Sequence, residues 1–197
     1  MIPALVLAAG KSTRMGQTKA LLPLGAETFI SRIVRTFRAA GVEDVVVVIG
    51  HDAPRVSDAL GRLEPAPRIV LNAGYESGQL SSILAGLRAI DRPGVTAMLL
   101  TLVDVPLVSA DTVRAVLLRY RTTSAAVVRP VSGSLHGHPV LIDRQLFQQL
   151  RAADTASGAK PIVRAHASAA GDVEVDDEGA FMDIDTPAEY AAAAARL

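Results

Sequence analysis

Short apolar runs alternate along the chain with longer stretches whose apolar residues recur at helical spacing. Several of the runs are apolar at every position, which is typical of parallel strands that are covered on both faces. The predicted strands are Ala4–Ala8, Val45–Ile49, Ile69–Leu71, Met98–Leu102, Ala125–Val128 and Val140–Ile142. The predicted helices are Glu27–Ala40, Leu80–Ile90, Asp111–Tyr120 and Gln145–Arg151, with Gly41 as a stop signal for the first.

This alternation of strands and helices predicts an α/β fold: a single Rossmann-like domain over residues 1–197, with helices on both faces of a mostly parallel sheet. One antiparallel strand is expected near Arg129–Ile142. A last helix should begin near the C-terminus, where Thr186, Pro187 and Glu189 match an N-cap, a first-turn proline and the glutamate of a capping box.

Composition excludes several classes of function. The chain has no cysteine, so it has neither a thiolate nucleophile nor a cysteine zinc site. Its 20 basic and 20 acidic residues argue against a nucleic-acid or anionic-membrane partner, because both need a basic excess. No segment approaches the roughly 20 apolar residues of a membrane span, and the N-terminus lacks the basic-then-apolar order of a signal peptide. A cytoplasmic protein is expected.

The loop that follows the first strand combines glycines with positive charge. Gly10 and Gly16 can expose backbone N–H groups, and Lys11, Arg14 and Lys19 place three cations within nine positions. Ligands of open α/β sheets bind at the carboxyl ends of strands, so this loop is a candidate triphosphate site. Its spacing fits neither a P-loop nor a dinucleotide fingerprint. An ordinary surface loop with scattered cations is the alternative.

Two acidic segments are candidates for binding a metal. Asp104 lies at the end of an apolar run and just before Pro106, where it could hold a cation or simply form a turn. Asp183 and Asp185 are one residue apart, so in an extended segment only one of them should point into a site. The alternative for Asp185 is a structural role, since it stands at a helix N-terminus, where the helix dipole favours a negative charge.

The segment Leu7–Leu24 resembles the signature of the MobA-like nucleotidyltransferases, and more narrowly that of their molybdenum-cofactor cytidylyltransferase branch. The resemblance implies a nucleotide-diphospho-sugar transferase-like fold and a loop that wraps the triphosphate. Arg14 and Lys19 would contact phosphates and act with Asp104 in catalysis. Ala9 stands where the branch that uses GTP carries a glycine, which favours CTP. The implied nucleotide-binding residues of this segment are Leu7, Ala8, Ala9, Gly10, Lys11, Ser12, Arg14, Met15, Gly16 and Lys19.

Other segments resemble the same family. Asp104 matches the aspartate that holds Mg²⁺, and Asp185 becomes the second ligand, with Asp183 as the alternative. Further candidate contacts are Asn72, Gly78 and Ser82 for the base or ribose and Arg129 and His138 for the acceptor substrate. The segment Ala156–Ile162 departs from the family pattern on the acceptor side, which puts the identity of the acceptor in doubt.

The implied reaction is the Mg²⁺-dependent transfer of CMP from CTP to the phosphate of molybdopterin, with release of pyrophosphate. A client molybdoenzyme is an implied partner, and a monomer or weak dimer is expected. Two alternatives remain. One is a related enzyme that uses GTP or another small phosphorylated acceptor. The other is a chaperone that binds nucleotide or pterin without turning it over.

Overall fold

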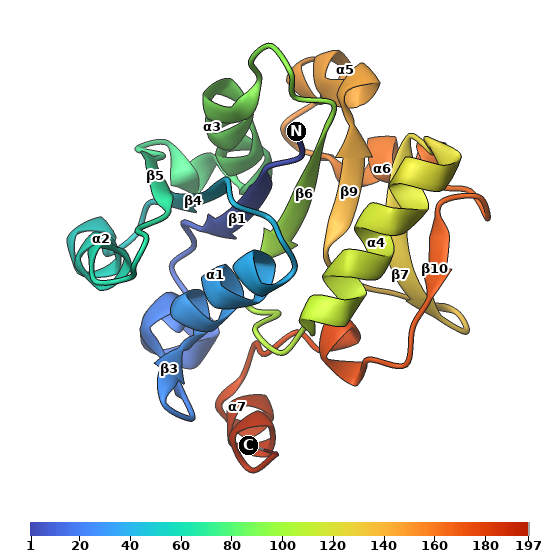
Figure 1. Ribbon diagram of the computed structural model, residues 1–197. Helices are drawn as coiled ribbons and strands as arrows, with labels where there is room; N and C mark the ends of the chain where they lie inside the picture. Colours follow the sequence, from blue (N-terminus) through green and yellow to red (C-terminus); the bar gives the residue numbers. More distant parts are fainter. Residues whose placement is uncertain (197) are drawn as a thin grey trace.

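An eight-stranded mixed sheet forms the centre of the protein (Figure 1). The computed structural model describes residues 1–196. Its order is β10-β7-β9-β6-β1-β4-β5, with β8 paired to β7. Parallel pairing joins β6, β1, β4 and β5, while β9 runs antiparallel to both β6 and β7. The strands are β1 (Ala4–Ala8), β4 (Val45–Ile49), β5 (Arg68–Leu71), β6 (Ala97–Leu102), β7 (Val127–Ser132), β8 (Leu135–His136), β9 (Val140–Asp143) and β10 (Asp172–Glu174). The predicted α/β class and the antiparallel strand are confirmed.

Helices cover both faces of the sheet (Figure 1). Successive residues of β1 enter different apolar clusters: Val6 packs with residues of α1, α2 and α4, and Leu5 packs with residues of α3 and α5. Both clusters are apolar, which explains why β1 and β4 are hydrophobic at every position. The helices are α1 (Phe29–Ala39), α2 (Ala53–Gly61), α3 (Gln79–Ile90), α4 (Ala110–Thr123), α5 (Phe147–Arg151), α6 (Lys160–His166) and α7 (Pro187–Ala194).

A small hairpin and the C-terminal helix form a third apolar cluster. Strands β2 (Pro23–Leu24) and β3 (Glu27–Thr28) pair antiparallel, and α7 lies beside them (Figure 1). Tyr190 of α7 donates a hydrogen bond to the carbonyl of Pro23. The segment that precedes α7, which carries Asp183 and Asp185, is thereby held close to the loop that follows β1.

Several predicted boundaries were wrong. The first helix begins at Phe29 instead of Glu27, because Glu27 and Thr28 belong to β3 and Thr28 caps the helix. Strand β7 continues through Pro130 to Ser132, although proline usually ends a strand, because β10 pairs with β7 at that position. The sequence patterns also missed α2, α6, β8, β10 and the β2–β3 hairpin.

The parallel strands bring several loops to one edge of the sheet. The loops after β1, β4, β5 and β6 all leave from carboxyl ends of parallel strands. Short 3-10 turns shape two of these loops: Thr13–Met15 and Lys19–Leu21 follow β1, and Tyr75–Ser77 follows β5. Within residues 1–196, no helix has the length and apolar character needed to cross a membrane.

Candidate active site

A cavity of about 360 Å³ lies at this edge of the sheet. The loop after β1, the loop after β6, the start of α3 and the segment before α7 all contribute to it. Its lining residues are Leu7, Ala8, Ala9, Gly10, Ser12, Thr13, Arg14, Thr18, Lys19, Ala20, Tyr75, Gly78, Gln79, Ser82, Leu102, Val103, Asp104 and Asp185. Most of the candidate nucleotide-binding residues are therefore brought together.

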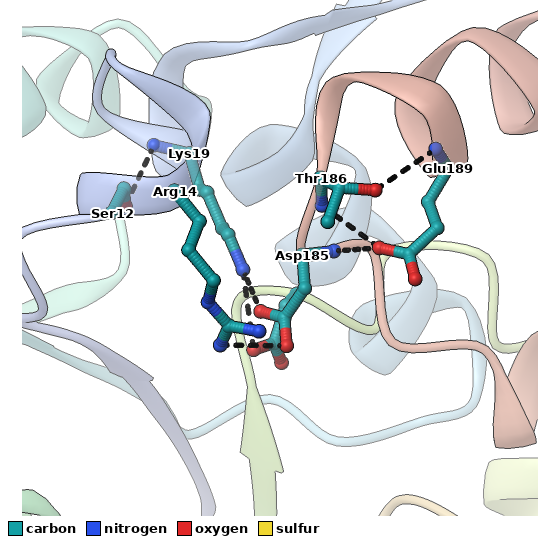
Figure 2. A network of polar contacts seen from close by, with 7 residues as sticks. Ser12, Arg14, Lys19, Asp185, Thr186 and Glu189 are labelled. Atoms are coloured by element: carbon teal, nitrogen blue, oxygen red, sulfur yellow. Dashed lines mark hydrogen bonds and ion pairs between the residues drawn. The ribbon is translucent and has the colours of Figure 1, made fainter.

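The loop after β1 is folded back on itself by two left-handed residues. Ser12 has φ 53° and Gly16 has φ 70°, on either side of the 3-10 turn Thr13–Met15. The hydroxyl of Ser12 then accepts a hydrogen bond from the backbone N–H of Lys19, with a donor–acceptor distance of 3.2 Å (Figure 2). This closure places Arg14 and Lys19, five positions apart, on the same side of the loop.

Both of these cations contact the same carboxylate. Lys19 is 7% exposed, and its Nζ donates a hydrogen bond to Asp185 and lies 3.6 Å from Oδ2 of Asp104. Arg14 reaches the second oxygen of Asp185, with Nη2 and Oδ2 2.8 Å apart (Figure 2). The hydrogen bond from Lys19 holds the pKa of the Asp185 carboxyl below its usual range, against the opposing effect of burial. A buried ammonium group needs such partners, so the four side chains form one unit.

Asp104 has an oxygen without a partner. Its Oδ1 is buried and receives no hydrogen bond from any group in residues 1–196. Burial raises the pKa of this carboxyl, Lys19 lowers it, and the charges of Asp183 and Asp185 raise it further. An unpaired carboxylate oxygen next to a second carboxylate suits a divalent cation, which prefers oxygen ligands.

Asp104 and Asp185 could bind a divalent cation whose remaining ligands do not come from the protein. The described part of the chain holds no group of three or more acidic or histidine side chains that could bind a metal on its own. Mg²⁺ commonly takes only one or two protein carboxylates and fills its other positions with phosphate oxygens and water. Asp104 and Asp185 match that requirement.

His138 and Asp183 lie beside this unit. Burial lowers the pKa of the His138 imidazole, while a hydrogen-bond contact to the carbonyl of Leu100 and the charges of Asp183 and Asp104 raise it. Asp183 is exposed and does not line the cavity, whereas Asp185 does. Asp185 is therefore the better placed of the two candidate second ligands, although the charge of Asp183 also acts on Asp104.

Arg129 lies away from the cavity. It is in the middle of β7, directly opposite Asp172 of β10, and its Nε donates to Oδ1 of Asp172 over 2.9 Å. This ion pair is a structural contact between neighbouring strands, and the expected role of Arg129 at the acceptor substrate stays a prediction.

Other candidates have structural contacts of their own. Asn72 is buried and ties its loop to α3, because its side-chain amide donates to the hydroxyls of Ser81 and Ser82. Met15 packs in the apolar cluster beside α7. Lys11 pairs with Glu76 at 2.5 Å and, with Gly16, lines a neighbouring cavity of about 540 Å³.

Sequence reasoning also missed cavity residues. Tyr75, Gln79 and Thr18 line the cavity that holds Asp104 and Asp185 but belong to no recognised motif position. For Tyr75 a signal was present, since it is an aromatic residue within a polar, glycine-containing loop that follows a strand. Such a loop has no apolar core of its own to bury a ring.

Known proteins resemble this chain in sequence and in fold. The model of a family described as MobA-like NTP transferase domain matches residues 4–170. Nicotine blue oxidoreductase of Paenarthrobacter nicotinovorans is 34% identical over 194 residues, which covers 94% of this chain and 92% of that protein.

Two solved structures share nearly the whole fold. A nucleotidyl transferase from Methanothermobacter has a TM-score of 0.82 and 26% identity, and the match covers 100% of this chain and 97% of that one. Rv0371c of Mycobacterium tuberculosis, solved as a complex with manganese, has a TM-score of 0.77 and 26% identity over 100% and 99% of the two chains. The comparisons together support a nucleotidyltransferase.

Proposed function

The chain belongs to the MobA-like NTP transferase family, and we propose that it transfers CMP from CTP to the phosphate of molybdopterin and releases pyrophosphate. One observation carries this proposal. Two cations, Arg14 and Lys19, meet two carboxylates, Asp104 and Asp185, in a cavity at the carboxyl ends of the parallel strands. Nucleotidyl transfer needs this combination, because both reactants and the leaving group are anions.

The reaction exchanges one phosphorus–oxygen bond for another. An oxygen of the acceptor phosphate bonds to the α-phosphorus of CTP. The bond from that phosphorus to the oxygen that bridges to the β-phosphorus breaks, and pyrophosphate leaves with the electron pair. A phosphate monoester has its second pKa near 6, so the attacking oxygen carries a negative charge at neutral pH. No general base is required, and positioning and charge neutralisation become the main tasks of the protein.

Arg14 and Lys19 carry out the charge neutralisation. In the structure their positive charges are balanced by Asp185 and, more distantly, Asp104. A triphosphate that enters the cavity offers these cations a larger negative charge at the same place. Arg14, whose side chain is 68% exposed, is free to turn toward it, whereas the buried Lys19 is fixed in position.

A divalent cation, for which we propose Mg²⁺, would be held by Asp104 and Asp185. When bound it would neutralise charge that develops on the phosphate oxygens. The buried, unpartnered oxygen of Asp104 supports this assignment, and so does the manganese complex of Rv0371c.

Two residues bear on which nucleobase and which acceptor the site binds. Ala9 lines the cavity, and the resemblance to the family, whose GTP-using branch carries a glycine at this position, favours CTP. His138 lies within electrostatic reach of Asp104 and is our candidate for contact with the acceptor phosphate.

An assay with four nucleotides tests the proposal. Purified protein is incubated with Mg²⁺, molybdopterin and CTP, GTP, ATP or UTP in turn, and the pterin product is identified by mass spectrometry. We expect a cytidylated pterin with CTP and none when the pterin is omitted. A product with GTP alone would overturn the assignment of the base.

An absence of product would separate the remaining alternatives. If CTP or molybdopterin binds and no nucleotide is transferred, the chain acts as a binding or delivery protein. If transfer occurs only when another phosphorylated acceptor is supplied, the molybdopterin assignment is wrong and the enzyme class stands.

A further inference from the structure

Tyr75 is the only aromatic residue among those that line the cavity of Asp104 and Asp185. It begins the 3-10 turn Tyr75–Ser77 after β5 and is partly buried. Its hydroxyl has no hydrogen-bond partner within residues 1–196, although ordered tyrosines often have one, as Tyr120 and Tyr190 do here. The ring therefore borders the cavity without being fixed by a polar contact.

Packing holds the ring in place instead. Gly50, the residue directly after β4, leaves room for it: a Cβ atom at this position would lie 2.8 Å from Cβ, Cγ and Cδ1 of Tyr75, which is closer than such atoms approach. The ring of His51 lies next to it, with 6.2 Å between the ring centroids. A rigid ring with little rotational freedom loses little entropy when a flat ligand stacks on it.

Tyr75 lies at the end of the cavity opposite the carboxylates. In the sheet order β6-β1-β4-β5, Asp104 follows β6, and Tyr75 follows β5 and packs over the end of β4. Arg14 and Lys19 contact Asp185 on the side of Asp104. Ala8, Ala9 and Gly10 also line the cavity, and they end or follow β1, which lies between β6 and β4 in the sheet. A nucleotide whose phosphates meet Lys19 thus has its base directed toward Tyr75.

We propose that Tyr75 is a nucleobase-stacking residue of the nucleotide site, an assignment that rests on the proposed function. Gly78 and Gln79, which follow Tyr75 closely in the chain, line the same cavity, and Tyr75 itself is only partly buried. Stacking tolerates every base, because each has a π-face. Tyr75 therefore contributes affinity for the nucleoside part of the ligand, and the choice between CTP and GTP is made elsewhere.

Binding of two ligands to the wild type and to two variants tests this assignment. CTP and inorganic tripolyphosphate, each with Mg²⁺, are titrated calorimetrically into the wild type, Tyr75→Ala and Tyr75→Phe. We expect Tyr75→Ala to weaken CTP binding by about 5- to 150-fold, the range that corresponds to the loss of one stacked base. Tyr75→Phe should bind CTP within about twofold of the wild type, since it keeps the ring. Tripolyphosphate should bind all three proteins equally.

Gly50→Ala provides an independent variant, because its methyl group displaces the ring without removing it. It should weaken CTP binding in the wild-type background and have no further effect on Tyr75→Ala. The stacking assignment is wrong if Tyr75→Ala binds CTP as well as the wild type does, or if it loses tripolyphosphate equally, which would indicate a damaged cavity. Wild-type protein that binds neither ligand would instead contradict the proposed function.

Discussion

Asp104 is the residue on which the proposed chemistry depends most. Its carboxyl is largely buried, one oxygen has no partner in the described chain, and burial holds its pKa above the usual range. Such an arrangement costs folding free energy, because a buried carboxylate without full compensation is unfavourable. A site that tolerates this cost is typical of function rather than of stability.

We therefore expect Asp104→Asn to lose activity without losing stability. The neutral amide removes a ligand for the cation, so pyrophosphate release should fall by about 10²-fold or more. The thermal midpoint of Asp104→Asn should equal or exceed that of the wild type. The substitution removes a buried negative charge, and Lys19 retains its ion pair with Asp185. Asp183→Asn is the matched control: it removes an exposed carboxylate near the same place and should retain most of the activity. Equal losses in both variants would contradict the assignment of the ligands.

The two carboxylates should also respond differently to pH. The pKa of Asp104 is raised, chiefly by burial, and that of Asp185 is lowered, chiefly by its hydrogen bond from Lys19. As pH falls, Asp104 should accept its proton first, above the ordinary value of 3.8. Because a metal ligand must be ionised, the affinity for Mg²⁺ with CTP should decline from that raised pKa downward. Titration of binding against pH checks this. Affinity that holds constant down to pH 3.8 would contradict it.

At the scale of elements, the start of α7 connects a local folding signal to the site. Thr186 accepts a hydrogen bond from the N–H of Glu189, and the Glu189 carboxylate accepts from the N–H groups of Asp185 and Thr186, each at 2.8 Å (Figure 2). The capping box therefore fixes the backbone of Asp185 as well as the helix. This cap was predicted from the sequence, and the structure confirms it.

Thr186→Ala should reduce both stability and activity. Loss of an N-cap costs about 1 kcal/mol, which lowers the thermal midpoint by about 2–4 °C in a chain of this size. Ser109→Ala is the matched control, because Ser109 caps α4 in the same way and lies outside the cavity lining. Both variants should lose similar stability, and only Thr186→Ala should lower the affinity for Mg²⁺ with CTP. If the two variants bind equally well, the cap plays no part in positioning Asp185.

Tyr120 links α4 to β9 far from the cavity. Its hydroxyl donates to Oδ2 of Asp143 and lies 3.1 Å from the carbonyl oxygen of Thr96, and burial, followed by the contact with Asp143, raises the pKa of Tyr120 to about 12. A raised tyrosine pKa adds stability that is present below pH 10 and is lost as pH rises through about 12.

Tyr120→Phe should therefore be less stable than the wild type near neutral pH, and the difference should shrink between pH 10 and 12. Denaturant unfolding at a series of pH values measures it. A difference that stays constant over that interval would mean that the Tyr120 hydroxyl does not titrate differently in the folded and unfolded states.

The sequence predicted the elements with strong periodicity and missed those with weak patterns. Strands β1 and β4 matched to the residue, because their continuous apolar runs are bounded by polar segments. Helix α6 has seven residues and none of them is fully buried; only Ile162 and Val163 pack against the core, which is too few for a helical pattern to show. Strand β10 has three residues and depends on pairing with β7, which is far away in the chain. Such elements are determined by tertiary contacts.

At the scale of the whole molecule, the fold brings distant segments to one edge of the sheet. Arg14 and Asp185 are far apart in the sequence, yet their side chains meet because α7 packs beside the β2–β3 hairpin. Motifs predicted many of the residues that line the cavity but not how these residues pair. The contact of Lys19 with both carboxylates and the position of Tyr75 required the structure.

The most direct test of nucleotidyl transfer follows where the α- and γ-phosphorus atoms of CTP end up. Protein, Mg²⁺ and molybdopterin are incubated with CTP labelled at either the α- or the γ-phosphorus, and the products are separated. Nucleotidyl transfer predicts that the α label appears on the pterin and the γ label in pyrophosphate, in equal amounts, and that both products form about 10²-fold or more slowly with Asp104→Asn. A γ label on the pterin, or α label that remains in CTP while the pterin is altered, would contradict the central claim.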